Sequence, residues 1–288
     1  MNAQTYEIWK EEAAYGEYIA QLAVMSLVDE ADLTPKPGLV DRNSSGSHSD
    51  MTIETMHRSA YALKDTFVKM AEVSFYQKPS QQLREQLAEI GRYGEQDMFK
   101  ATGGVNTHKG AIWSLGLLAS AAAINGPNVT AWQITQTAGA IARYPDRKSP
   151  KQATNGKKVR HRYGVPGAVG EAQQGFPHIM IYALPALKKA REKGASERHA
   201  KLDALLSLMA SLDDTCILHR GGKEALSITK AGARAVLKAG GSLTPAGMKA
   251  LSFLDEKLVS INASPGGSAD LLAAAIFLDR LSNLSAFR

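Results

Sequence analysis

The sequence predicts an all-α protein, and we expect residues 1–288 to form a single domain of about ten helices. Three observations support this prediction. Apolar residues recur at the spacing of an amphipathic helix along most of the chain. Alternating apolar and polar runs bounded by turn residues, which would indicate strands, do not occur. The chain also contains no internal repeat of the kind that builds a solenoid.

In the first half of the chain, helical spacing predicts helices over residues 6–28, 52–70, 80–99, 111–124 and 130–143. Thr52 has the side chain of an N-cap, and Pro79 and Ser80 favour a new helix start. The stretch from 111 to 124 is rich in Ala and Leu and almost free of charge, so we expect it to be a buried central helix.

In the second half, we expect helices over residues 171–193, 198–218, 223–239, 245–261 and 265–281, the first of them interrupted at Gly175–Phe176–Pro177. Pro245 and Pro265 suit the first helical turn, with Thr244 and Ser264 before them as N-caps. The segment between Tyr144 and Gly167 has no sustained period. We expect it to be a mobile loop.

Composition restricts the partners that we expect. The formal net charge is +6, and part of the excess lies in a basic run from Arg143 to Arg162. This run has no aromatic interleaving and no nucleic-acid motif accompanies it, so we expect no nucleic-acid partner. No stretch is apolar and long enough to span a membrane, and the acidic N-terminus is unlike a signal peptide. The one cysteine, Cys216, excludes an internal disulfide and fits a cytoplasmic protein.

A segment rich in proline, glycine and charge separates the first two predicted helices, from Leu33 to Met51. Pro35 and Pro37 prevent it from being helical. The segment contains several charged residues and a histidine, which are Lys36, Asp41, Arg42, His48 and Asp50. An ordinary surface loop and one wall of a binding site both fit this composition.

Two further glycine-rich segments carry candidate functional groups. In D-M-F-K-A-T-G-G-V-N-T-H-K-G, Asn106, His108 and Lys109 precede the predicted buried helix, so backbone amides and a lysine could bind an anion there. In Y-G-V-P-G-A-V-G-E-A-Q-Q-G-F-P, Glu171 could be a general base, a metal ligand or only a favourable charge on the helix dipole.

Two last segments resemble phosphate and metal sites. In D-D-T-C-I-L-H-R-G-G, we expect Asp213 and Asp214 to end a helix, where they oppose its dipole and favour a bound Mg²⁺, while His219 and Arg220 suit phosphate. Cys216 is more typical of a small core residue than of a nucleophile. In S-P-G-G-S-A-D, the start of a helix offers amides for phosphate and Asp270 for metal, although a well-capped helix explains the same residues.

Five motifs occur together and in order: P-K-P-G-L-V-D-R, G-V-N-T-H-K-G, G-E-A-x-x-G-F-P, D-T-x-x-x-H-R-G-G and S-P-G-G-S-A-D-L-L. Over about residues 30–272 the chain resembles the triphosphoribosyl-dephospho-CoA synthase family. The resemblance implies an all-helical enzyme that joins ATP to 3′-dephospho-CoA and releases adenine. The product is the precursor of the prosthetic group on the acyl carrier subunit of citrate lyase or malonate decarboxylase. Here Cys216 replaces the family's asparagine, and the sequence around it, D-D-T-C-I-L-H-R, more closely resembles the malonate decarboxylase branch.

With this reaction in view, each candidate residue receives an expected role. The phosphate-binding candidates are Lys36, Arg42, Asn106, Lys109, Arg220, Gly266, Gly267 and Ser268. The candidates for an expected Mg²⁺ are Asp213, Asp214, Asp270 and Asp50. Glu171 and Asp41 compete for the role of general base, and His48, His108 and His219 compete for phosphate contact and for the acid.

Two other functions fit the same sequence. The protein could be a non-catalytic nucleotide-binding partner of the lyase complex, whose basic run docks the acyl carrier subunit. It could also be a hydrolase of ADP-ribose-like substrates, in which metal-bound aspartates meet a ribose. The sequence leaves the oligomeric state open, with a homodimer among the options.

Overall fold

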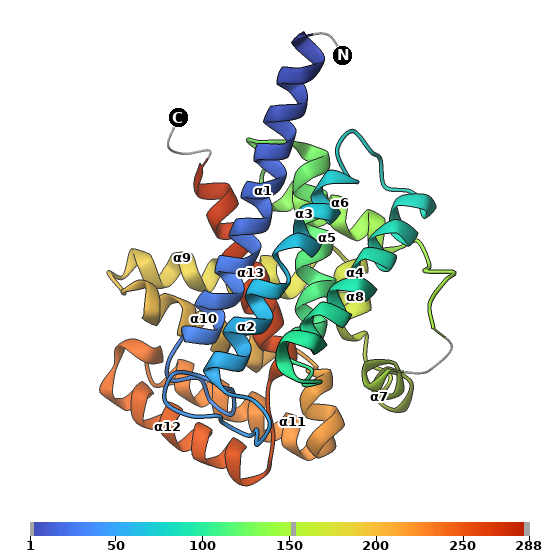
Figure 1. The fold of residues 1–288 in the computed structure, drawn as a ribbon. Helices are drawn as coiled ribbons and strands as arrows, with labels where there is room; N and C mark the ends of the chain where they lie inside the picture. Colours follow the sequence, from blue (N-terminus) through green and yellow to red (C-terminus); the bar gives the residue numbers. More distant parts are fainter. Residues whose placement is uncertain (1–2, 151–153, 285–288) are drawn as a thin grey trace.

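The computed structural model describes residues 3–150 and 154–284, and within these ranges it contains helices and no strand. The all-α prediction is therefore confirmed, and Figure 1 shows how the helices are arranged. Their bounds are α1 Ala3–Asp32, α2 Ile53–Ala62, α3 Lys64–Glu72, α4 Gln81–Thr102, α5 Lys109–Asn125, α6 Ala131–Ala142, α7 Asn155–Tyr163, α8 Gly167–Gln173, α9 Leu184–Glu192, α10 Glu197–Ser211, α11 Thr215–Lys238, α12 Pro245–Ser260 and α13 Gly266–Leu284. A π-helical turn, Ile179–Ala183, precedes α9, and a 3-10 turn, Gly241–Leu243, precedes α12.

Helix α5 forms the centre of the hydrophobic core, as its composition predicts. Its side chains from Ala111 to Ala123 are buried with the single exception of Trp113. Helices α1, α3, α4, α6 and α13 pack around it. Nearly all of the buried apolar side chains belong to one continuous cluster, which fits a single domain. None of the described helices is both long and apolar enough to cross a membrane.

The basic segment expected to be a loop contains a helix, α7. Thr154 caps it by accepting a hydrogen bond from the backbone of Lys157, and Gly164 ends it in the left-handed conformation at φ 70°. Its last turn carries Arg160 and Arg162, whose charges stabilise the negative end of the helix dipole. The two caps and these charges stabilise a helix that has little apolar periodicity. Residues 151–153 of the predicted loop lie outside the described part of the chain.

The helix predicted over residues 198–218 is wrong, because the chain breaks after Ser211. Leu212 adopts an extended conformation, and Asp214 begins a new helix, α11, as its N-cap. The aspartate therefore lies at the positive end of a helix dipole and not at the negative end that the sequence suggested. Helix α11 then runs to Lys238 with a kink at Gly222, so the predicted start near Lys223 marks a bend within one helix.

Other boundaries also differ by a few residues. Helix α8 begins at Gly167, before the predicted start at Glu171, and the interruption at Gly175–Phe176–Pro177 is confirmed. Thr244 caps α12 as predicted. Helix α13 begins at Gly266, one residue after Pro265, and Ser264 hydrogen-bonds His48. The amides at the start of α13 instead donate to the carboxylate of Asp214, which is distant in sequence. The candidate site lies at this contact.

Candidate active site

The positive ends of three helices meet at one place in the fold. A side-chain oxygen of Asp270, in the first turns of α13, lies 1.9 Å from where a Cβ on Gly110 would be, so α13 and the start of α5 are in close contact. Gly267 in α13 approaches the carboxylate of Asp214, the N-cap of α11. We call this place the N-terminal junction of α5, α11 and α13.

Asp214 holds two of these helices together. Its Oδ1 accepts hydrogen bonds from the amides of Cys216, Ile217 and Gly267, and its Oδ2 accepts from the amide and the hydroxyl of Ser268. Its surface is 2% exposed, and this burial raises its pKa against the opposing effect of the donors. With its carboxylate used in this way, Asp214 is a shared cap for α11 and α13.

Replacing Asp214 with alanine should therefore destabilise the protein. Each helix cap contributes about 0.5–2 kcal/mol, so we expect the free energy of unfolding to fall by about 1–4 kcal/mol when both are lost. Urea denaturation measures this. Ser196 precedes α10 without a capping hydrogen bond and is a matched control. A loss no larger for Asp214→Ala than for Ser196→Ala would contradict the shared cap.

Asp270 is the carboxylate of the junction that has the fewest partners. It accepts one hydrogen bond, from the amide of Ala111 at the start of α5, and the residue as a whole is half-buried although its carboxylate is buried. Burial of the carboxylate holds its pKa well above its ordinary range, and the nearby charges of Glu30 and Asp214 raise it further. An alanine at position 110 would occupy the space of this carboxylate. The last glycine of G-V-N-T-H-K-G, Gly110, is therefore required by its contact with Asp270.

A buried ion pair lies beside this carboxylate. Lys36 donates from Nζ to the Oε1 and the backbone oxygen of Glu30, each at 2.6 Å, and the two side chains are 1% and 3% exposed. Lys36 is thus committed inside the protein, which corrects its expected role as a phosphate contact. Its charge partly compensates the acidic residues of the junction.

His108, the N-cap of α5, is a neutral and fully buried donor. Thr107 donates to the hydroxyl of Ser59, which leaves that hydroxyl free to donate to Nδ1 of His108 at 2.7 Å. The proton of the ring is then on Nε2, which is buried without a partner among the described residues. Burial, with the nearby charge of Lys36, lowers the pKa of His108 to about 3. His108 therefore cannot serve as an imidazolium acid near neutral pH.

The segment from Leu33 to Met51 is fastened against α11, α12 and the loop before α13. The ring of His48 bridges Ser264 and Arg220, and Arg220 also donates to the backbone of Ser47 and to Asn262. Burial and the charge of Arg220 lower the pKa of His48. Figure 1 shows this segment lying against α11 and α12. Arg220 and His48 thus anchor the segment beside the junction.

The two residues expected to compete for general base are both occupied. Asp41 accepts hydrogen bonds from the amides of Lys36, Asn43 and Ser44, so it shapes its own loop. Glu171 accepts two hydrogen bonds from His178, one from its amide and one from its ring at 2.7 Å. Both carboxylates are buried. Hydrogen bonds occupy both oxygens of each of them, whereas Asp270 accepts only one hydrogen bond, so the geometry favours Asp270 over them.

The remaining predicted residues are dispersed. Lys109 ion-pairs with Glu95, and Arg42 with Asp32. Asp213 pairs with Lys230 and Asp50 lies beside His48, so neither joins Asp214 and Asp270. Asn106 and His219 are exposed. Within the part of the chain that is described, no group of three or more His, Cys, Asp or Glu residues is arranged to hold a metal ion, and the expected Mg²⁺ stays a prediction.

Cys216 lies inside the junction, against Gly266. Burial raises the pKa of its thiol well above the ordinary value, and the charges of Asp214 and Asp270 add to the effect. The thiol therefore stays protonated, which agrees with a packing role and not with a nucleophile.

Sequence reasoning missed three residues that contact predicted site residues. They are Glu30, Ser59 and His178. A signal existed for the first: Asp29, Glu30 and Asp32 are acids at the negative end of α1, where they oppose its dipole and need cationic partners. The other two had no local signal, because their partners are brought together by the fold.

Comparison with known proteins defines the class to which this fold and site belong. The family model described as ATP:dephospho-CoA triphosphoribosyl transferase matches residues 16–288. Since this covers nearly the whole chain, the chain belongs to that family, and the resemblance seen in its five motifs is confirmed.

Curated relatives agree with the family match. A protein of Pseudomonas syringae pv. syringae (strain B728a) is 51% identical over 270 residues, which are 93% of each chain. One of Stutzerimonas stutzeri (strain A1501) is 50% identical over 96% of this chain and 95% of the relative. One of Azotobacter vinelandii (strain DJ / ATCC BAA-1303) is 51% identical over 92% and 91%. Each is named a probable 2-(5″-triphosphoribosyl)-3′-dephosphocoenzyme-A synthase. No solved structure matches the chain significantly.

Proposed function

We propose that this chain joins ATP to 3′-dephospho-CoA and releases adenine, and that the reaction takes place at the N-terminal junction. The 2′-hydroxyl oxygen of dephospho-CoA bonds to the anomeric carbon of ATP's ribose, and the bond from that carbon to adenine breaks. The observation that carries the proposal is the buried Asp270 carboxylate, which has few partners and lies beside two further carboxylates, in a chain of this family.

Three carboxylates at one point suit this substitution. Its transition state resembles an oxocarbenium ion, so positive charge develops on the sugar. Glu30 and Asp214 are held in place by buried partners and provide negative charge there. Asp270 takes the proton of the attacking hydroxyl, because its raised pKa makes it a stronger base than an ordinary aspartate. The departing adenine takes up a proton from solvent, and Asp270 returns its proton to solvent after the transfer.

Two cations near this acidic centre suit the phosphates of the substrates. Lys109 is the first residue of α5, and Arg220 lies close to the start of α11. The dipoles of both helices also favour anions there. Gly167 packs against both Arg160 of α7 and Thr215 of α11, so the basic helix flanks the junction. The described side chains do not form a metal site, so we propose that any Mg²⁺ enters on the triphosphate.

Incubation of the protein with ATP, Mg²⁺ and 3′-dephospho-CoA tests the proposal. Mass spectrometry should detect free adenine together with a triphosphoribosylated dephospho-CoA. Free ribose triphosphate without the adduct would indicate an N-glycoside hydrolase. Binding of nucleotide or carrier subunit without adenine release would indicate an assembly partner.

Four finer assignments stay predictions. The sequence D-T-C, which ends at Cys216, favours a role in making the prosthetic group of malonate decarboxylase over that of citrate lyase. The genes adjacent to this one would decide between the two. Contacts with the enzymes of the acyl carrier pathway and a cytoplasmic location follow from that role. The oligomeric state, including a homodimer, can be measured by light scattering.

A further inference from the structure

A cavity of about 500 Å³ lies between the end of α1, the following loop and the first turns of α10, and its volume is within the size range of ligand pockets. It is lined by Asp29, Asp32, Leu33, Thr34, Pro35, Arg42, Asn43, Arg198 and Lys201. The same chain segment, from the end of α1 into the following loop, reaches both this cavity and the N-terminal junction. Residues 29 and 32–35 line the cavity, whereas Glu30 and Lys36 belong to the junction.

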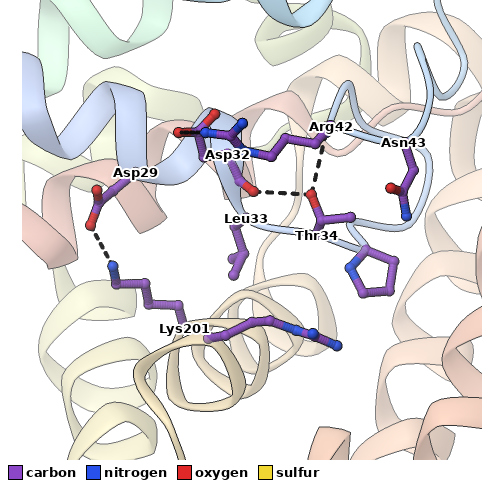
Figure 2. A pocket seen from close by; sticks show the side chains of 9 residues that line it. Asp29, Asp32, Leu33, Thr34, Arg42, Asn43 and Lys201 are labelled. Atoms are coloured by element: carbon purple, nitrogen blue, oxygen red, sulfur yellow. Dashed lines mark hydrogen bonds and ion pairs between the residues drawn. The ribbon is translucent and has the colours of Figure 1, made fainter.

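The cavity walls carry more positive than negative charge. Asp29 is shared by Lys201 and Arg280, and Asp32 by Arg42 and His57. Each acid is therefore already opposed by two partners. Figure 2 shows Arg42 with Asp32 on one side of Leu33 and Lys201 with Asp29 on the other.

Arg198, on α10, is the cation of this cavity that has no assigned partner. It is exposed, and it makes no ion pair or side-chain hydrogen bond with the residues that the structure describes. Its guanidinium is free to offer several donors to one anion, and phosphate oxygens match that geometry. The side chain of Arg42 is 61% exposed and can turn toward the same ligand.

We propose that this cavity binds the phosphate chain of a nucleotide substrate, with Arg198 as its principal contact and Arg42 and Lys201 beside it. This proposal rests on the proposed function for the identity of the substrate. In both ATP and dephospho-CoA, the 5′ phosphates lie several bonds from the reacting ribose atom. A nucleotide whose ribose is at Asp270 therefore needs a separate place for its phosphates, and the cavity is a cationic space lined by the same chain segment that holds Glu30 and Lys36.

Binding of inorganic tripolyphosphate tests the cavity independently of the reaction. Calorimetry of the full-length protein should show that Arg198→Ala raises the dissociation constant about ten-fold or more, because a charged hydrogen bond to phosphate is lost. Arg198→Glu should raise it further. Lys188→Ala removes an exposed charge from α9 and should leave the dissociation constant unchanged. An equal constant in wild type and Arg198→Ala, or an equal rise in Lys188→Ala, overturns the proposal.

Steady-state kinetics then identifies the phosphate chain. Arg198→Ala should raise the KM for ATP if the triphosphate occupies the cavity, or for dephospho-CoA if its diphosphate does, with little change in kcat. A fall in kcat with both KM values unchanged would contradict a binding role. If the wild type shows no adenine release while Arg198→Ala still weakens tripolyphosphate binding, the proposed function fails and the anion site stands.

Discussion

Asp270→Asn should reduce the rate of adenine release by about two to four orders of magnitude, the usual contribution of a general base. Asparagine keeps the size of the side chain but cannot accept the proton of the attacking hydroxyl. The loss should appear in kcat, since the neutral side chain still fits beside Gly110 and both substrates still bind. Release of adenine from ATP in the presence of saturating dephospho-CoA measures it.

Glu171→Gln is the control for this variant, because Glu171 is a buried carboxylate that the structure assigns to His178. It should keep most of the wild-type rate as long as it is folded. In the wild type, kcat/KM should fall as the pH is lowered through the raised pKa of Asp270, since only the ionised carboxylate is a base. Asp270→Asn should lack this dependence. A folded Glu171→Gln protein that loses as much rate as Asp270→Asn would overturn the assignment.

Lys36→Met should be among the most destabilising single substitutions in this protein. It removes the ammonium from a buried pair and leaves the Glu30 carboxylate without its counter-charge. Breaking such a pair costs about 3–5 kcal/mol, and we expect that loss in the free energy of unfolding from urea denaturation.

A double substitution separates the pair from simple loss of packing. Lys36→Met combined with Glu30→Gln removes both charges, so it should be more stable than Lys36→Met alone. If the loss of stability in the double variant equals the sum of the losses in Lys36→Met and Glu30→Gln, the two side chains do not act as a pair. A loss of less than about 1 kcal/mol for Lys36→Met would show that the ammonium is not essential there.

Much of the fold could be predicted because its signals are local. The apolar stretch of α5, the Ser80 cap of α4 and the Thr244 cap of α12 each depend on neighbouring residues. The errors occurred where a distant partner or a weak local signal decides the structure. Asp214 begins α11 and also caps α13, which no local pattern shows. Helix α7 forms through its caps with little apolar period.

The sequence singled out the segments that form the candidate site, but it did not predict the roles of individual residues within them. All five glycine-rich segments lie at helix ends, yet the chemistry of each charged residue depends on burial. Lys36 and Arg42 stand in one motif, and the first is buried in an ion pair whereas the second is exposed. Asp41 and Glu171 have the residue type of a base, but hydrogen bonds from the fold occupy both. Arg198 lies outside every motif.

The most direct test of the active-site assignment is a crystal structure of the Asp270→Asn protein with ATP and 3′-dephospho-CoA bound. We predict that the anomeric carbon of ATP and the 2′-hydroxyl of dephospho-CoA lie side by side at residue 270, between the starts of α5 and α13. Nucleotides bound together elsewhere, for example along α8 at Glu171, would contradict the assignment.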